Sequence, residues 1–383
     1  MNILILGAGM MARAIAYDLC RYSKSSLITI ADNNKDSLRL MRDFLPDFSF
    51  NYVKLNVEDT SGISGIFKKM DIVISAVPYR YNYILAKQAV RACTNFIDLG
   101  GNNEIVQREL SLKEKAERAG VIIIPDCGLA PGLVSVITRD IVEHMSSIDY
   151  VKIRVGGLPV HPQPPLDYQI VFSVDGLINE YVEDAVVLDN KKIIYKPSLT
   201  EVEKIRFKRP FGALEAFLTS GGCSTLPYTY KDKVGYLDYK TIRYPGHCEK
   251  IKLLFDLGLA DKKPIPAGNK KITPREVLTH LLNKNLPSEG DDVVLLRVYG
   301  RGVINDKRYV STYSMIDYGE PEHGISAMMR TTGYPVSVTA QMIQQGVIKE
   351  HGVYTPEEVI PPVLFLRELR KRGLVIKKRK QPV

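Results

Sequence analysis

Asn2-Ile3-Leu4-Ile5-Leu6-Gly7-Ala8-Gly9-Met10-Met11-Ala12, at the start of the chain, decides the fold. The five residues before Gly7, of which Ile3 to Leu6 are all apolar, have the character of a short buried strand, and a helical pattern follows as far as Arg21. A strand, a glycine turn and a helix form the first unit of a dinucleotide-binding sheet, although a GxGxxA string also occurs in ordinary loops. In such a unit the second glycine lets backbone amides approach a pyrophosphate, which then lies at the positive end of the helix dipole. We therefore expect a dinucleotide here.

An acidic residue after the next strand indicates which dinucleotide is bound. The apolar run Leu27–Ala31 ends in Asp32, about twenty residues beyond the glycine turn, where a carboxylate accepts hydrogen bonds from a ribose. A carboxylate repels a 2'-phosphate, and Asn33 follows where an NADP site would favour arginine, so we expect NAD. The alternative is a solvated aspartate at a strand end. The cofactor-binding residues that we predict are Gly7, Gly9, Met10, Met11, Asp32, Asn33, Val77 and Pro78.

Composition places the chain among ordinary globular proteins. It has 383 residues, 45% of them hydrophobic and 25% charged, which is enough for two domains. It lacks an apolar run of the roughly 20 residues that a membrane span needs, and its first strand is too short for a signal peptide, so we expect a cytoplasmic protein. The five cysteines show no metal-ligand spacing, and we expect free thiols and no metal. Part of the net charge of +9 comes from a C-terminal basic run, interpreted as a solvated tail rather than a nucleic-acid site.

Helices and strands alternate after Asp32, which predicts an α/β fold with a doubly wound parallel sheet of the Rossmann type. We expect the further strands of this sheet at 50–57, 71–77, 94–99 and 121–125, and helices at 37–44, 60–69, 83–92 and 106–119. Ligands bind at the carboxyl ends of such strands. Asp32, Pro78, Asp98 and Asp126 should therefore lie along one rim.

The pattern changes near residue 130. A helix at 133–145 is followed by β-rich segments at 150–155, 167–172, 185–187, 236–244 and 292–299, which predict a second, α+β domain. A helix at 335–345 could fold back on the first domain. We predict an NAD-binding domain over 1–130 completed by about 326–365, a substrate and dimerisation domain over 131–325, and a basic tail over 366–383.

Four polar residues near glycine and proline are candidates for chemistry. Arg243 has a planar guanidinium that can hold a carboxylate in a bidentate pair, or it is a surface arginine of a hairpin. His247 can exchange a proton near neutral pH, although a lone histidine is more often structural. Asp98 and Asp126 follow sheet strands where a nicotinamide is expected, and they could accept a proton, hold an ammonium, or cap a turn.

Four blocks in this sequence resemble the saccharopine dehydrogenase superfamily, and within it they look most like the lysine 6-dehydrogenases. The resemblance runs from Asn2 to about Pro361, and its most specific blocks are Ile124-Pro125-Asp126-Cys127-Gly128-Leu129-Ala130-Pro131-Gly132, the segment 156–168, Thr219-Ser220-Gly221-Gly222, and Thr241-Ile242-Arg243-Tyr244-Pro245-Gly246-His247. Saccharopine reductases and carboxynorspermidine dehydrogenases typically carry an aspartate where this chain has Ala130. That departure favours the lysine-type branch.

The resemblance implies NAD-dependent oxidative deamination of the ε-amine of L-lysine. The product, 2-aminoadipate 6-semialdehyde, cyclises to a piperideine carboxylate, and ammonia is released. One alternative is an NADP-dependent reductase of the saccharopine or carboxynorspermidine type. Another is a non-catalytic, NAD(H)-sensing regulator that uses the basic tail on nucleic acid. We expect a small-molecule partner, a homodimer, and no nucleic-acid or membrane partner.

Roles for individual residues follow as hypotheses. We expect Arg243 to hold the α-carboxylate, and Asp98, Asp126 or His247 to manage protons, with the choice among these three left open. The other substrate-binding residues that we predict are Tyr168, Lys240, Tyr244, Thr331 and Thr332.

Overall fold

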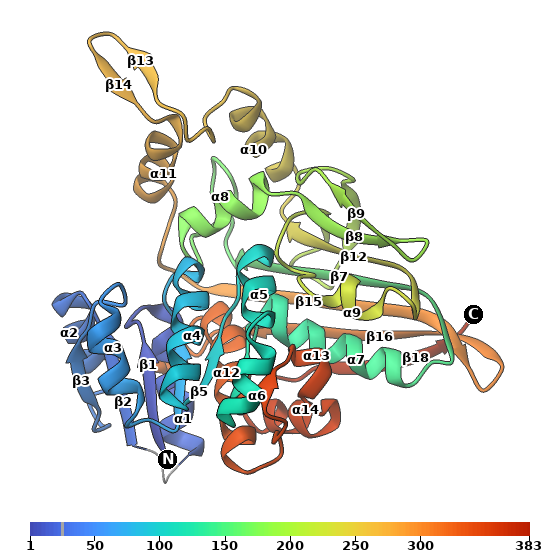
Figure 1. The fold of residues 1–383 in the computed structure, drawn as a ribbon. Helices are drawn as coiled ribbons and strands as arrows, with labels where there is room; N and C mark the ends of the chain where they lie inside the picture. The colour runs from blue at the N-terminus through green and yellow to red at the C-terminus, as the bar shows by residue number, and fades with distance from the viewer. Residues whose placement is uncertain (24–26) are drawn as a thin grey trace.

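The computed structural model describes residues 1–23 and 27–383 and contains two large sheets, each with its own helices (Figure 1). The first sheet has seven strands, all parallel, in the order β17 (Gly352–Val353), β6 (Ile122–Ile124), β5 (Asn95–Asp98), β4 (Ile72–Ser75), β1 (Asn2–Leu6), β2 (Leu27–Asp32) and β3 (Asn51–Lys54). Its helices are α1 (Met10–Tyr22), α2 (Lys35–Phe44), α3 (Thr60–Phe67), α4 (Asn82–Ala92), α5 (Asn103–Leu110) and α6 (Lys113–Ala119). The predicted Rossmann sheet is confirmed.

The central strands of this sheet are apolar because both of their faces are covered. Residues Ile3 to Leu6 of β1 and every residue of β4 are buried. Parallel strands bring their carboxyl ends to one edge, so the residues after β1, β2, β4, β5 and β6 share the predicted rim.

The second sheet has nine strands and is mostly antiparallel. Its main path is β10 (Glu203–Arg206), β11 (Ala213–Leu218), β12 (Val234–Arg243), β7 (Ser147–Pro159), β15 (Asp292–Ile304), β16 (Lys307–Tyr318) and β18 (Lys377–Pro382), with β8 (Ala185–Asp189) on β12 and β9 (Lys192–Lys196) on β8. Helices α7 (Val134–Glu143), α13 (Pro356–Val359) and α14 (Pro362–Lys371) lie below its long strands in Figure 1. The predicted α+β character of this part is confirmed.

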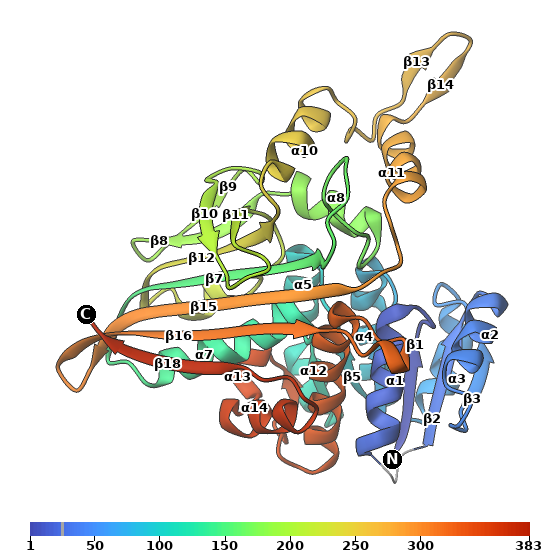
Figure 2. The same cartoon turned by 180° about the vertical axis from the view of Figure 1, so that it is seen from behind.

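A third group of elements projects beyond the second sheet, as both views show (Figure 2). It contains α8 (Val174–Val182), α10 (His247–Asp256), α11 (Pro274–Asn285) and a hairpin of β13 (Ile265–Ala267) and β14 (Lys270–Ile272), while α9 (Leu226–Tyr230) lies beside β8 and β12. Helix α8 matters most below, because it approaches the rim of the first sheet.

The chain returns to its first domain after the second sheet. Helix α12 (Ala327–Gln344) packs so closely on α1 that a Cβ at Gly333 would lie 2.8 Å from Cβ of Ala14. Strand β17 then pairs with β6 at the edge of the first sheet. No helix within the described ranges is long and apolar enough to cross a membrane.

Three local predictions were wrong. The helix expected at 106–119 is interrupted, because the Ser111 hydroxyl donates to the Arg108 carbonyl (2.6 Å) at the end of α5. Residues 167–172 form a loop in which Tyr168 and Ile170 are buried, and the Ile170 amide donates to the Pro287 carbonyl (2.8 Å). The buried side chains there imitate a strand pattern without a neighbouring strand.

The third correction concerns the conformation of the basic C-terminal run, because Lys377–Pro382 is exposed to solvent as expected but forms a strand. Residues 366–371 belong to α14 and Lys377–Pro382 is edge strand β18, antiparallel to β16. Lys378 forms an ion pair with Asp140 (2.6 Å) and lies over the ring of Tyr313. Alternate cationic side chains therefore find acidic and aromatic partners on one face of the strand, which a charge count does not reveal.

A buried ion pair holds the C-terminal segment to α1. The Arg372 guanidinium lies 2.8 Å from the Asp18 carboxylate, and both side chains are 1% exposed. Arg372 also donates to Gln341 on α12 (3.2 Å), so α1, α12 and α14 meet at one cation. Burial raises the pKa of Asp18, and the Arg372 charge opposes that rise.

Replacing Arg372 should destabilise the first domain. Arg372→Met leaves the Asp18 carboxylate buried without its cation, and we expect the free energy of unfolding to fall by about 3–5 kcal/mol in urea denaturation. The exposed neighbour Arg370 provides the control: Arg370→Met should stay within about 0.5 kcal/mol of the wild type. Equal losses for the two variants would contradict this role of the ion pair.

Candidate active site

A cavity of about 410 Å³ follows the carboxyl ends of β1, β2 and β4. It is lined by Gly7, Gly9, Ala31, Asp32, Asn33, Ser37, Leu55, Asn56, Val57, Glu58, Ala76, Val77, Pro78, Arg80 and Tyr81. Gly7 has φ +98°, and a Cβ there would lie 2.9 Å from the Ala76 carbonyl oxygen, so a side chain does not fit this turn. A Cβ at Gly9 would meet nothing within 4 Å, which leaves open space at the start of α1.

These residues fit a dinucleotide. Helix α1 has no acidic residue in its first turn to compete with a phosphate for the helix N-terminus. The Asp32 carboxylate accepts from the amides of Ala8 and Asn34, each at 2.8 Å, so it supports the glycine turn. A carboxylate has about four lone-pair positions, and those that remain can accept from ribose hydroxyls.

A second cavity of about 270 Å³ continues from the first, because Val77 and Pro78 line both. It lies between the two domains. The first domain and the turns after its strands contribute Met11, Tyr79, Leu99, Gly100, Gly101, Gly128, Leu129, Ala130 and Pro131; the remaining wall is formed by Val155, Gly156, Gly157, Phe172, Ser173, Gly176, Glu180, Tyr239, Thr241, Arg243, Met328 and Thr332. A cavity that adjoins a dinucleotide-binding cavity is where a reacting small molecule would lie. We call the first cavity the dinucleotide trough, or outer cavity, and the second the inner cavity.

Strand β12 presents alternate residues to this cavity. Tyr239, Thr241 and Arg243 line it, whereas Lys240 and Ile242 point to the other face of the sheet. The Arg243 guanidinium is 3% exposed; its Nη1 donates to the Ile242 carbonyl (2.9 Å) and its Nε to the Tyr181 hydroxyl (3.0 Å). Its Nη2 has no hydrogen-bond partner within the described ranges. The cation can therefore receive an anionic ligand.

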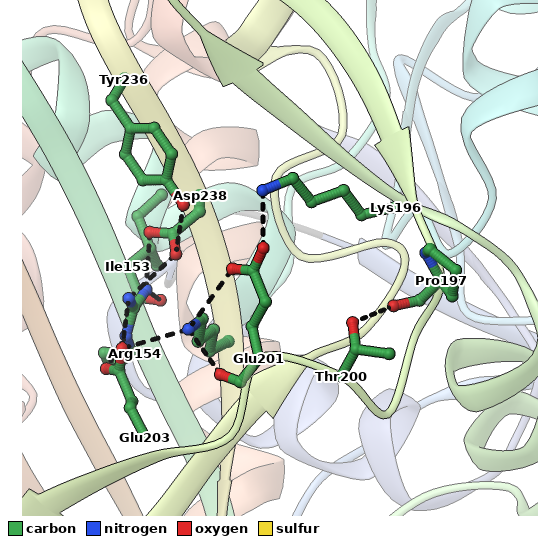
Figure 3. A network of polar contacts seen from close by, with 10 residues as sticks. Ile153, Arg154, Lys196, Pro197, Thr200, Glu201, Glu203, Tyr236 and Asp238 are labelled. Carbon is green, nitrogen blue, oxygen red and sulfur yellow. Dashed lines mark hydrogen bonds and ion pairs between the residues drawn. The ribbon is translucent and has the colours of Figure 1, made fainter.

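Lys240 does not reach the cavity, contrary to the expectation that it binds substrate. Its Nζ donates to the Glu201 carbonyl (2.6 Å) and to the Glu203 carboxylate (3.2 Å), as part of a charged network. In that network the fully buried Arg154 pairs with Asp238 (2.8 Å) and Glu203 (2.6 Å) (Figure 3). The period of two along β12 separates Lys240 from Arg243, so this charged network holds β7, β10 and β12 together behind the site.

His247 lies behind Arg243. Burial and the charge of Arg243 lower the pKa of His247 to about 3, so the ring is neutral. Its Nδ1 therefore donates to the Leu166 carbonyl (3.0 Å), and its Nε2 accepts from the Tyr181 hydroxyl (3.1 Å), which in turn accepts from Arg243. With both ring nitrogens engaged, the histidine orients the guanidinium through Tyr181 and has no free position for a substrate proton.

Asp98 and Asp126 are buried behind the cavity wall. The Asp98 carboxylate accepts from the Gly100 amide (2.6 Å), and burial raises its pKa to about 6. Asp126 accepts from the Ser224 hydroxyl, and burial raises its pKa well above the usual range. Gly100, which has φ +73°, lies between Asp126 and the cavity; a Cβ there would overlap the carboxylate. The two aspartates support the turns of the wall and do not line it.

Some of the other predicted residues line the second cavity, and others lie behind it or away from it. Thr332 and Met11 line the second cavity, whereas Met10 lines a separate groove and the Thr331 hydroxyl donates within its helix to the Ala327 carbonyl (2.7 Å). The ring of Tyr168 lies 5.0 Å from the Arg243 guanidinium carbon, as a buried support. Tyr244 follows the end of β12, where its hydroxyl donates to the Pro159 carbonyl (2.9 Å), away from the cavity.

Tyr239, Thr241 and Glu180 are among the cavity residues that sequence reasoning missed. Tyr239 and Thr241 follow from Arg243 by the two-residue period of the strand that was expected at 236–244. Glu180 lies on α8, which the sequence interpretation did not predict. Ser173, Gly176 and Glu180 recur at helical spacing and share the face that lines the cavity. That spacing was the available signal.

The fold and the two joined cavities define a two-domain protein that fits a dinucleotide beside a small anionic molecule. The family described as saccharopine dehydrogenase NADP binding domain matches residues 3–124, and the one described as saccharopine dehydrogenase C-terminal domain matches residues 128–374. The chain belongs to the saccharopine dehydrogenase family.

Individual relatives are distant. Saccharopine dehydrogenase [NADP(+), L-glutamate-forming] of Saccharomyces cerevisiae is 23% identical, over 99% of each chain. The mitochondrial alpha-aminoadipic semialdehyde synthase of Mus musculus is 21% identical over 98% of this chain, which spans about half (47%) of that relative. A solved structure of apo saccharopine dehydrogenase (L-Glu forming) from Saccharomyces cerevisiae covers 99% of each chain with a TM-score of 0.81 at 22% identity, which is a likeness of fold.

A side chain at Gly9 should weaken dinucleotide binding without changing the stability of the fold. Because a Cβ at Gly9 meets no protein atom within 4 Å, Gly9→Ala should unfold at the wild-type temperature. It should weaken NADH binding about tenfold or more in fluorescence titration, since the backbone could no longer approach the pyrophosphate.

Gly65→Ala on α3 serves as the control, because a Cβ there also meets nothing within 4 Å and lies outside both cavities. Unchanged NADH affinity in Gly9→Ala would contradict the assignment of the trough.

Proposed function

We propose that the protein catalyses NAD-dependent oxidative deamination of the ε-amine of L-lysine, with formation of 2-aminoadipate 6-semialdehyde and release of ammonia. The observation that carries this proposal is the charge of the inner cavity. Among the described residues that line it, Arg243 is the one cation and Glu180 the one acid. A substrate with one carboxylate and one distant ammonium matches that pair.

Arg243 has the chemistry to select the carboxylate. A buried guanidinium is costly unless its donors are satisfied, and its Nη2 is the donor that a substrate oxygen would complete. Tyr181, His247 and Tyr168 hold the group in place, so little ordering remains to be done on binding. The amino acid would extend from Arg243 toward the nicotinamide end of the trough near Val77 and Pro78.

The choice of NAD rests on Asp32. Its carboxylate lies in the outer cavity where the adenosine ribose belongs, and its charge disfavours the phosphate that distinguishes NADP. The exposed Arg80 lines the same cavity, but its guanidinium is stacked on the Tyr81 ring at 4.6 Å. Bound there, the dinucleotide would supply the hydride acceptor, while the residues described above hold and orient the amine.

A second candidate is an NADP-dependent reaction of the saccharopine type. The names of the relatives, at 21–23% identity, favour it. Saccharopine carries three carboxylates, and this cavity offers one guanidinium to receive them and one carboxyl that would repel them. For that reason we place lysine first.

Absorbance of reduced nicotinamide distinguishes the two candidates. Wild-type protein mixed with L-lysine should reduce NAD. We expect kcat/KM for NAD to exceed that for NADP at least about tenfold, and kcat/KM for L-lysine to exceed that for saccharopine by the same factor, which corresponds to about 1.4 kcal/mol. Reduction of NADP with saccharopine, and none with lysine, would contradict the proposal and support the second candidate.

The Arg243→Lys variant tests the carboxylate role in the same assay. Lysine keeps the charge but loses the planar fork, so KM for L-lysine should rise about tenfold or more while the affinity for NADH stays unchanged. The exposed Arg91, changed to lysine, is the matched control. A KM equal to that of the wild type would remove Arg243 from substrate binding.

A further inference from the structure

Oxidation at the carbon that bears the amine requires a group that accepts a proton. An alkyl ammonium has a pKa of about 10.4, so lysine arrives protonated at neutral pH. A hydride can leave that carbon only after the nitrogen has a free lone pair. The cavity must therefore contain a base, and this requirement rests on the proposed function.

The titratable groups named from the sequence do not meet this requirement. The lone pair on His247 Nε2 already accepts from Tyr181, and its Nδ1 donates to Leu166. Asp98 and Asp126 lie behind Gly100 and do not line the cavity. The base must be a group on the wall itself.

Glu180 lies on that wall. It is carried by α8, whose residues Val174, Leu177, Ile178 and Tyr181 are buried against the protein, so Ser173, Gly176 and Glu180 face the cavity. Within the described ranges no hydrogen bond or ion pair is formed by its carboxylate. Arg243, which lines the same cavity, is close enough to lower its pKa.

The surroundings of Glu180 bring its pKa close to neutral pH, where it can accept a proton. Burial raises the pKa of Glu180 to about 7; the Arg243 charge limits the rise, and the Glu183 carboxylate adds to it. A general base is most effective when its pKa lies near the working pH. Tyr239 and Thr241, its neighbours on the wall, carry hydroxyls, and burial raises the pKa of Tyr239, so that phenol stays protonated.

We propose that Glu180 is a catalytic residue, the base that takes the proton from the substrate ammonium before hydride transfer. The N–H bond breaks, its electron pair stays on nitrogen, and an O–H bond forms on Glu180. The neutral amine then loses a hydride from its carbon to NAD, which is reduced to NADH, and becomes an iminium. Water adds to the iminium carbon, the C–N bond breaks, and ammonium and aldehyde leave; Glu180 returns its proton to solvent.

Glu180 also restricts the substrate class. A carboxylate beside the reacting nitrogen attracts a cationic amine and repels a carboxylate borne by a second carbon bonded to that nitrogen. A saccharopine-type substrate carries such a carboxylate and would be disfavoured there. Arg243 and Glu180 thus offer opposite charges to the carboxylate and the reacting ammonium of one amino acid.

The test is the pH profile of Glu180→Gln. In the wild type kcat/KM should rise through about pH 7 as Glu180 ionises. In Glu180→Gln we expect kcat to fall about 100-fold at pH 8, with the loss shrinking toward pH 10 as the free amine becomes neutral by itself. Glu180→Asp should recover part of the rate. NADH affinity and unfolding temperature should equal those of the wild type.

Asp184→Asn is the matched control, because Asp184 is an exposed carboxylate just beyond α8 and outside the cavity. A Glu180→Gln enzyme with a rise in KM alone, or with an unchanged pH profile, would overturn the proposal. The profile is measured with whichever amine the wild type oxidises: turnover of saccharopine without lysine contradicts the proposed function, while the shift with Glu180→Gln still decides the role of Glu180. Oxidation of neither amine would overturn both.

Discussion

The buried guanidinium of Arg243 is the interaction around which the site is built. A cation at 3% exposure is tolerable only where its donors find acceptors, and Ile242, Tyr181 and, through Tyr181, His247 provide this support. These partners come from β12, α8 and the start of α10, so three separate segments must meet for the charge to be buried. Arg243 lines the cavity, and its Nη2 is left without a partner among the described residues. The buried charge of Arg243 helps to keep His247 neutral. It also belongs to the face of β12 on which Tyr239, Thr241 and Arg243 line the cavity.

The first domain was predictable because its signals are local. Gly7 and Gly9 follow a strand that is buried on both faces, and Asp32 ends the next strand, so a periodic pattern and a turn position suffice. The second domain was predictable in class but not in detail. The segment 167–172 resembles a strand because Tyr168 and Ile170 are buried, yet their partners come from distant segments of the chain. The C-terminal basic run pairs with β16, and that partner cannot be read from charge.

The sequence analysis placed Arg243 in the site correctly, but it assigned the residues around Arg243 less well. Arg243 was identified because a guanidinium near glycine and proline is unusual in type and place. Lys240 was misplaced because its nearness to Arg243 along the chain was given more weight than the two-residue period of a strand. His247 and the two aspartates were chosen as proton acceptors by residue type, whereas burial and existing hydrogen bonds decide whether a group can accept a proton. Glu180 required the tertiary structure, since only the docking of α8 near the rim brings it into the cavity that Arg243 also lines.

The most direct measurement of the account follows the hydrogen that leaves the substrate. L-lysine deuterated at its ε-carbon is incubated with the protein and NAD, and the reduced nicotinamide is examined by mass spectrometry. If Arg243 holds the carboxylate and the amine carbon lies at the nicotinamide end, deuterium appears in the NADH, and lysine deuterated at the α-carbon transfers none. Transfer from the α-carbon, or NADH that contains no deuterium from either substrate, would contradict the account.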